Sequence, residues 1–130
     1  METIFTLQTR KEDIDQLGHV NNCRYVQFLE DARVNWYENC GISLKDFREM
    51  SIGTVVLKLE VLYRKEANLG DHLKIITRSD YLGNTSFVLK QDIYNQFDEH
   101  ITDAKVTMVM FDTLLRKGIK VIDQIAQNFR

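Results

Sequence analysis

Apolar residues between positions 22 and 39 recur at helical spacing. The steps i, i+3, i+4, i+7 and i+11 place one face of a helix on Tyr25, Phe28, Leu29, Ala32 and Trp36. Asn21 or Asn22 is suited to cap the start of this helix, and Gly41 is suited to end it. The pattern therefore predicts one long amphipathic helix over residues 22–39.

Most other segments alternate between apolar and polar residues, which predicts β-strands. The predicted strands cover residues 3–8, 54–65, 72–82, 85–95 and 100–112. In the second of these, one face is expected to carry Val55, Leu57, Leu59, Val61 and Tyr63. Turns at 70–71, 83–84 and 96–99 predict that the last four strands form an antiparallel meander. Short helices are expected at 43–50 and 119–129.

A long helix with an apolar stripe and an antiparallel sheet must bury these faces against each other. We therefore expect an α+β fold in which a curved sheet of about five strands wraps around one central helix. The chain of 130 residues contains no internal repeat or low-complexity segment, so residues 1–130 are expected to form a single domain.

Composition narrows the functional classes. Hydrophobic residues make up 44% of the chain and the net charge is −2, which argues against nucleic-acid binding. No apolar run is long enough for a membrane span, and Met1–Leu7 is unsuited as a signal peptide. We expect a cytoplasmic protein in which Cys23 and Cys40 are reduced, buried and unreactive thiols.

The segment from Asp13 to Tyr25 carries the candidate chemistry. Two acids, Asp13 and Asp15, precede a helix start whose unpaired N–H groups and macrodipole can stabilise an oxyanion. A carboxylate beside such donors suffices for acyl transfer to water. The alternative for Asp15 is a turn or capping role, and His19 is as readily structural as chemical.

The residue patterns required for metal binding, serine hydrolysis and nucleotide-phosphate binding are missing from the sequence. The three histidines, His19, His72 and His100, have no metal-ligand spacing, so no metal site is expected. The chain has neither a Gly-x-Ser-x-Gly elbow nor a glycine-rich phosphate loop.

The segment reads Asp-x-Asp-x-x-Gly-His-Val-Asn-Asn-x-x-Tyr, from Asp13 and Asp15 through Gly18-His19-Val20-Asn21-Asn22 to Tyr25. This pattern resembles the entrance to the central helix in hotdog-fold acyl-CoA thioesterases of the 4-hydroxybenzoyl-CoA thioesterase-like branch. Tyr63 followed by Ala67-Asn68-Leu69-Gly70-Asp71 is similar to a strand connection of that branch, without the proline that usually stands near Ala67.

The resemblance implies roles for individual residues. Asp15 would be the nucleophile or general base, the backbone N–H of Asn22 would bind the thioester oxygen, and His19 would line the site. Asn21 and Tyr25 would contact substrate or shape the loop, as would Asp13. The resemblance also implies an acyl-CoA substrate, no cofactor, and a site completed by a second subunit in a homodimer or homotetramer. Possible contacts to the coenzyme A phosphates are Arg64, Lys65, Arg78 and Lys90.

Three other functions remain open at this point. The substrate could be an acyl carrier protein, although no cluster of basic residues marks a docking site for an acidic carrier. A hotdog hydratase would typically pair an acid with a histidine in a proline-containing loop, and this chain has no proline. The chain could also be a non-catalytic acyl-CoA-binding subunit.

Overall fold

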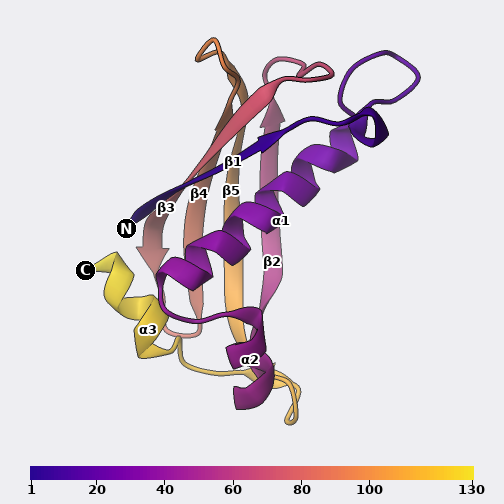
Figure 1. The fold of residues 1–130 in the computed structure, drawn as a ribbon. Helices are drawn as coiled ribbons and strands as arrows, with labels where there is room; N and C mark the ends of the chain where they lie inside the picture. The colour runs from indigo at the N-terminus through magenta and orange to yellow at the C-terminus, as the bar shows by residue number, and fades with distance from the viewer.

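The computed structural model describes all residues from 1 to 130. One long helix, α1 (Asn22–Asn39), lies across one face of a curled antiparallel sheet, and two short helices lie near one end of that sheet (Figure 1). The remaining elements, in chain order, are β1 (Glu2–Gln8), a 3-10 turn (Lys11–Asp13), α2 (Leu44–Met50), β2 (Ile52–Tyr63), β3 (His72–Leu82), β4 (Ser86–Tyr94), β5 (His100–Asp112), β6 (Lys117–Gly118), α3 (Asp123–Ala126) and a 3-10 turn (Gln127–Phe129).

The strand order in the sheet is β1-β3-β4-β5-β2, with the short β6 paired to β5. Strands β3, β4 and β5 form the expected meander, but the turn at 70–71 does not join a hairpin. Strand β2 pairs with β5, and the chain then crosses to the opposite half of the sheet to begin β3. The prediction of a four-strand meander was therefore wrong for β2, because local turn residues do not determine which distant strand supplies the hydrogen bonds.

Helix α1 begins and ends where the sequence predicts. Asn21 is the N-cap, and its side chain accepts a hydrogen bond from the N–H of Cys23 at 2.9 Å. Gly41 has a φ of +88°, a left-handed conformation that glycine adopts without steric cost. The predicted apolar face is buried against the sheet, with Leu29, Ala32 and Trp36 fully inaccessible.

Strand β2 forms one edge of the sheet and contains a β-bulge between Val56 and Lys58. The bulge inserts one residue and reverses the alternation. Val55 therefore pairs with Val109 on the outer face, whereas Leu59 and Val61 face α1 opposite the buried Val106 and Ala104. The expected single face from Val55 to Tyr63 was wrong for this reason.

The core consists of two apolar clusters. One surrounds the C-terminal half of α1 and includes Trp36, Tyr37 and Phe87. The other lies under its N-terminal half and includes Tyr25, Phe28 and Leu29. Both halves of the helix are thus anchored, which fixes the position of its N-terminus relative to the sheet.

Two further expectations need correction. The C-terminal helix begins at Asp123 rather than at residue 119, because the N–H groups of Ile119 and Val121 bond to carbonyls of Met110 and Asn84 instead of to a helical turn. Cys40 is buried as expected, whereas Cys23 is exposed. None of the helices has the length and apolar character needed to cross a membrane.

Candidate active site

A closed loop before α1 carries the motif residues. A β-bridge between Ile14 and Val20 holds the ends of the loop together, and Gly18 adopts a φ of +86° at its tip. The Asp13 carboxylate is buried and accepts hydrogen bonds from the Arg10 N–H at 2.8 Å and the Arg24 guanidinium at 2.7 Å. Asp13 therefore fastens the loop to the helix.

Asp15 lies within this loop, and its side chain is only partly buried. One carboxylate oxygen accepts the N–H of Leu17 at 2.9 Å, which fixes the orientation of the side chain. The other oxygen is 3.5 Å from the side-chain amide of Asn21. That second oxygen has no stronger partner in the chain, so it remains available as a base or nucleophile beside the start of α1.

The first residue of α1 has a free N–H donor. Asn21 caps the N–H of Cys23, and the N–H of Arg24 bonds to the Asn21 carbonyl. The N–H of Asn22 has no acceptor within the protein. This free N–H lies at the positive end of an 18-residue helix, where negative charge is stabilised.

A hollow of about 270 Å³ opens beside this helix end, and it is lined by His19, Val20, Asn22, Tyr25, Tyr63, Arg64, Lys65 and Glu66. The Tyr63 hydroxyl donates to the Asn22 carbonyl at 3.3 Å, and its ring lies 5.7 Å from that of Tyr25. The buried Tyr25 hydroxyl accepts the N–H of Ala67 at 2.9 Å. Burial raises the pKa of Tyr25, so it stays protonated and neutral.

Of the predicted site residues, the structure brings His19, Asn22, Tyr25, Arg64 and Lys65 together around this hollow. Asn21 and Asp15 do not line it; they contact each other at 3.5 Å in the loop before α1. Sequence reasoning did not select Glu66, an exposed carboxylate in the lining with no ion-pair partner. Its only signal is its position directly after Arg64-Lys65.

Comparisons with known proteins show which family the chain belongs to. A sequence model of the Thioesterase-like superfamily matches residues 9–129. The chain belongs to this superfamily. The long-chain acyl-CoA thioesterase FadM of Escherichia coli (strain K12) is 30% identical to it over 122 residues, covering 93% of this chain and 92% of FadM. The acyl-CoA thioester hydrolase YbgC of Escherichia coli O6:H1 is 31% identical over 119 residues, covering 92% and 89%.

A solved structure shows the same fold. The DHNA-CoA thioesterase from Staphylococcus aureus superposes with a TM-score of 0.87 at 23% identity, covering 92% of this chain and 80% of that chain. The expected hotdog architecture and the enzyme class, thioester hydrolase, are confirmed by these matches.

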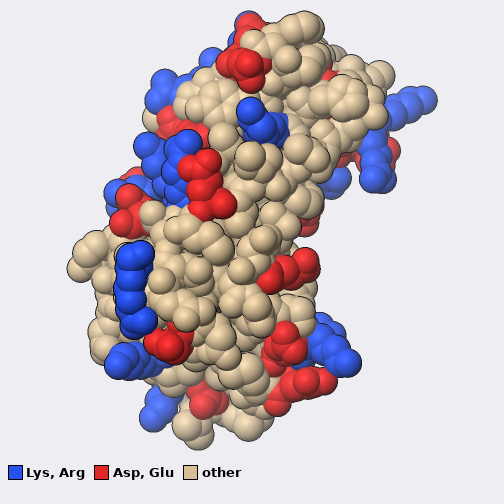
Figure 2. Space-filling model, turned by 60° about the vertical axis from the view of Figure 1, so that its left-hand side comes forward, with Lys and Arg blue, Asp and Glu red and all other residues tan.

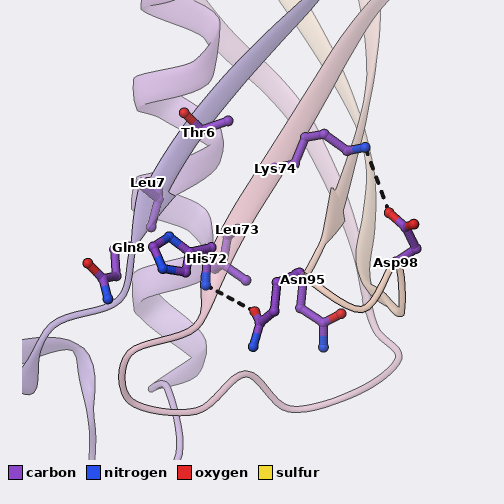
Figure 3. Close-up of a pocket in the computed structure, with 9 residues that line it drawn as sticks. Thr6, Leu7, Gln8, His72, Leu73, Lys74, Asn95 and Asp98 are labelled. Atoms are coloured by element: carbon purple, nitrogen blue, oxygen red, sulfur yellow. Dashed lines mark hydrogen bonds and ion pairs between the residues drawn. The ribbon is translucent and has the colours of Figure 1, made fainter.

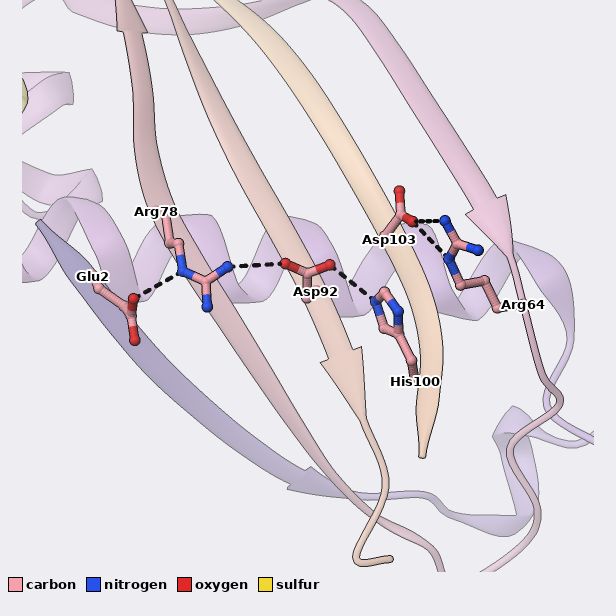
Figure 4. Close-up of polar contacts among 6 residues, drawn as sticks. All are labelled: Glu2, Arg64, Arg78, Asp92, His100 and Asp103. Atoms are coloured by element: carbon pink, nitrogen blue, oxygen red, sulfur yellow. Dashed lines mark hydrogen bonds and ion pairs between the residues drawn. The ribbon is translucent and has the colours of Figure 1, made fainter. Parts of the chain in front are cut away.

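In this thioesterase-like chain, the basic residues near the hollow are already neutralised. The Arg64 guanidinium pairs with Asp103 at 2.5 Å, and Lys65 pairs with Glu99. Arg78 lies on the face of the sheet opposite α1, between Glu2 and the buried Asp92 (Figure 4). Of the four basic residues named from the sequence, only Lys90 has no carboxylate within 4 Å, and it lines a different hollow on the outer face.

The same outer face holds Asp92, His100 and Asp103, whose side-chain ligand atoms lie within 4.8 Å of one another (Figure 4). Histidine spacing along the sequence did not reveal this group, because β4 and β5 bring its members together. Each carboxylate is already bound by an arginine, Asp92 by Arg78 and Asp103 by Arg64. The geometry therefore describes an ion-pair network rather than a free set of ligands.

Another hollow, of about 470 Å³, lies where the end of β1 pairs with the start of β3, next to the β4–β5 turn (Figure 3). His72 and Lys74 line it, and both contact the β4–β5 turn: the His72 N–H donates to Gln96, and Lys74 lies 3.9 Å from Asp98. It contains none of the motif residues. Elsewhere, acidic and basic side chains are interspersed in the view of Figure 2, which shows no continuous basic surface.

Proposed function

We propose that the protein hydrolyses acyl-CoA thioesters to the free acid and coenzyme A at the N-terminus of α1. The observation that carries the proposal is the free N–H of Asn22 at the start of α1. The Asp15 carboxylate is held by the N–H of Leu17 and lies 3.5 Å from the side-chain amide of the preceding residue, Asn21. The family membership and the acyl-CoA thioesters named for FadM and YbgC support it.

In the proposed reaction, the thioester oxygen accepts the N–H of Asn22, so charge that develops on this oxygen is stabilised by the helix end. Asp15 either removes a proton from the attacking water or attacks the acyl carbon and forms an anhydride that water then cleaves. Either route adds one water across the acyl–sulfur bond. The carbon–sulfur bond breaks, and the departing thiolate takes up a proton.

We propose further that the working unit is a dimer formed through β2. This strand is an unpaired sheet edge with exposed apolar residues, among them Leu57 (69% exposed) and Leu62 (56%). Antiparallel pairing with a second copy would satisfy the free backbone groups of the edge. It would also cover the hollow beside Tyr63, which is open to solvent in a single chain.

Hydrolysis of a panel of acyl-CoA esters tests the proposal. The panel runs from short to long aliphatic and aromatic acyl groups, with the released thiol as the readout. Asp15→Asn and Asp15→Ala are expected to lower turnover by about 10²–10⁴-fold, the usual contribution of a catalytic base. Glu12→Gln, which neutralises a nearby exposed carboxylate, serves as the matched control and should keep full activity.

Undiminished turnover in both Asp15 variants would overturn the assignment of Asp15. Turnover of acyl carrier protein thioesters alone would move the substrate to that class. Tight acyl-CoA binding without any turnover would identify the chain as a binding subunit.

A further inference from the structure

Arg33 is a buried cation without an acidic partner. It lies in the second half of α1, and only 6% of its surface is exposed. Its one hydrogen bond runs from Nη1 to the side-chain oxygen of Gln91 at 3.2 Å, and no carboxylate lies within 4 Å. Burial lowers the pKa of the guanidinium, as expected when a charge is removed from water. Such a charge is costly to bury unless something else compensates it.

The position of Gln91 is fixed by its other bonds. Its amide nitrogen donates to the Leu29 carbonyl and to the Thr77 hydroxyl, each at 3.0 Å. Its side-chain oxygen therefore faces Arg33 and accepts from it. Gln91 belongs to a row of inward-facing residues in register across the sheet, Thr3, Thr77, Gln91, Ala104 and Val61. Thr3, Thr77 and Gln91 are the polar part of this row, whereas Ala104 and Val61 belong to the apolar cluster under the N-terminal half of α1.

The remaining guanidinium N–H donors of Arg33 are not enclosed in the core but contact solvent. A guanidinium has five N–H donors, and only one nitrogen of Arg33 is bonded. No Arg33 nitrogen is among the buried polar atoms that lack both a partner and solvent contact, which are Thr3 Oγ1, Trp36 Nε1 and Thr102 Oγ1. The free N–H groups therefore reach the surface.

That surface belongs to the flank of α1 that faces β2. One turn further along the helix, the Tyr37 hydroxyl bonds to Thr54 of β2 at 2.9 Å. The candidate active-site hollow includes Tyr25 and Tyr63, whereas a separate hollow of about 380 Å³ includes Tyr37 and Thr54. Arg33 stands on α1 between Tyr25 of the first hollow and Tyr37 of the second, and it lines neither of the two.

The distance to the reacting carbon follows from the helix. Gln91 bonds to Leu29 and Arg33, so the guanidinium lies at the level of Leu29. This is seven residues, or about 10 Å, along α1 from Asn22. An extended octanedioyl group spans a similar distance from its thioester carbon to its far carboxylate.

We propose that Arg33 is a specificity-determining residue that binds an oxygen acceptor, in the strongest case a carboxylate, at the far end of the acyl group. The inference rests on the proposed binding of the thioester at Asn22. The preferred substrates are then acyl-CoA esters of medium length with a polar end, because a purely apolar chain leaves the cation unpaired.

Equilibrium binding tests this without requiring turnover. Octanedioyl-CoA and octanoyl-CoA have the same chain length and differ in the terminal carboxylate, and calorimetry measures both on the Asp15→Ala protein. We expect octanedioyl-CoA to bind at least tenfold more tightly. Adding Arg33→Met should remove this preference by weakening octanedioyl-CoA alone, whereas Arg33→Lys should retain part of it. Arg116→Met, which removes a positive charge before β6, is the matched control.

Equal affinities in the presence of Arg33, or a preference that survives Arg33→Met, would overturn the inference. If Arg33→Met does not fold, the comparison of the two ligands on the protein with Arg33 intact and on the Arg33→Lys variant still decides it. Absent hydrolysis together with the expected binding preference would refute the proposed catalysis and leave the role of Arg33 standing. Failure of both ligands to bind would refute both.

Discussion

The two ends of α1 differ in how completely the rest of the protein supplies hydrogen-bond acceptors and packing partners. At the C-terminal end, the N–H groups of Cys40, Gly41 and Ile42 bond to carbonyls of the last helical turn. The rings of Trp36 and Tyr37 pack with Phe47, Phe87 and Phe129. At the N-terminal end, the Asn22 N–H has no acceptor and the Asp15 carboxylate is partly exposed.

The difference shows how one helix serves two purposes. The packed end supplies stability through buried aromatic surface, and it holds the helix in one position. The open end keeps an unpaired N–H donor, which costs stability but is ready for a substrate oxygen. Changes at the first end should therefore affect folding, and changes at the second should affect turnover.

The largest effect is expected for Trp36→Ala. Trp36 is fully buried and touches rings from three directions, so its truncation should lower the free energy of unfolding by about 3–5 kcal/mol. Urea denaturation measures this loss. Trp36→Phe keeps a ring and removes a buried indole N–H that has no acceptor. It should cost much less, and an equal cost would show that aromatic packing is not the cause.

Asn22→Pro removes the free donor while keeping the helix. Proline is favoured at the first helical position, and Asn21 already has the extended backbone (φ −64°, ψ 141°) that precedes proline. Loss of one oxyanion donor should lower kcat by about 10²–10³-fold, with little change in the unfolding free energy. Asn22→Ala retains the N–H and should remain active. Normal kcat in the proline variant would exclude this N–H as the oxyanion donor.

Alkaline pH should weaken the packed end. Burial raises the pKa of Tyr37 to about 12, whereas an unfolded chain holds tyrosine near its ordinary value of about 10. The folded state thus binds the phenolic proton more tightly. This contribution is fully present below about pH 10 and is lost as the pH rises to about 12, by roughly 2–3 kcal/mol. The unfolding free energy of the wild type should fall relative to that of Tyr37→Phe across this range, and parallel curves would contradict the assignment.

The smallest effect is expected at the cap. Asn21→Ala removes the side-chain acceptor for the Cys23 N–H and should cost about 1 kcal/mol of stability. Asn21→Asp keeps an acceptor and should restore that stability. Because the Asp15 carboxylate lies beside Asn21, the aspartate variant should nevertheless lose activity through repulsion between like charges. Thermal melting and thiol release separate the two effects.

Local features of the fold were predictable from the sequence. The limits of α1, its Asn21 cap and the left-handed Gly41 follow from residues next to one another in the chain. The pairing of β2 with β5 and the bulge at Leu57 did not follow, because strand pairing depends on distant backbone groups. The apolar spacing from Ile119 similarly indicated a helix where tertiary hydrogen bonds impose an extended chain.

The candidate site likewise has residues that the local sequence places together and others whose environment depends on distant parts of the chain. The motif gathers Asp15, His19, Asn21 and Asn22 within one short loop, so the sequence alone places them together. Whether Arg64 or Lys65 is free to bind phosphate depends on their carboxylate partners, Asp103 and Glu99. Those partners come from the neighbouring strand and its preceding turn, and no local pattern reveals them. The buried position of Arg33 was hidden for the same reason.

The exposure of Cys23 has a practical consequence. This thiol is accessible and directly follows Asn22, whereas Cys40 is only 7% exposed, and burial raises its pKa to about 12. A maleimide fluorophore should therefore label Cys23 selectively in the unmodified sequence. The label would report the arrival of a ligand at the helix end as a change in emission, so occupancy of the site could be followed in real time without engineering a cysteine.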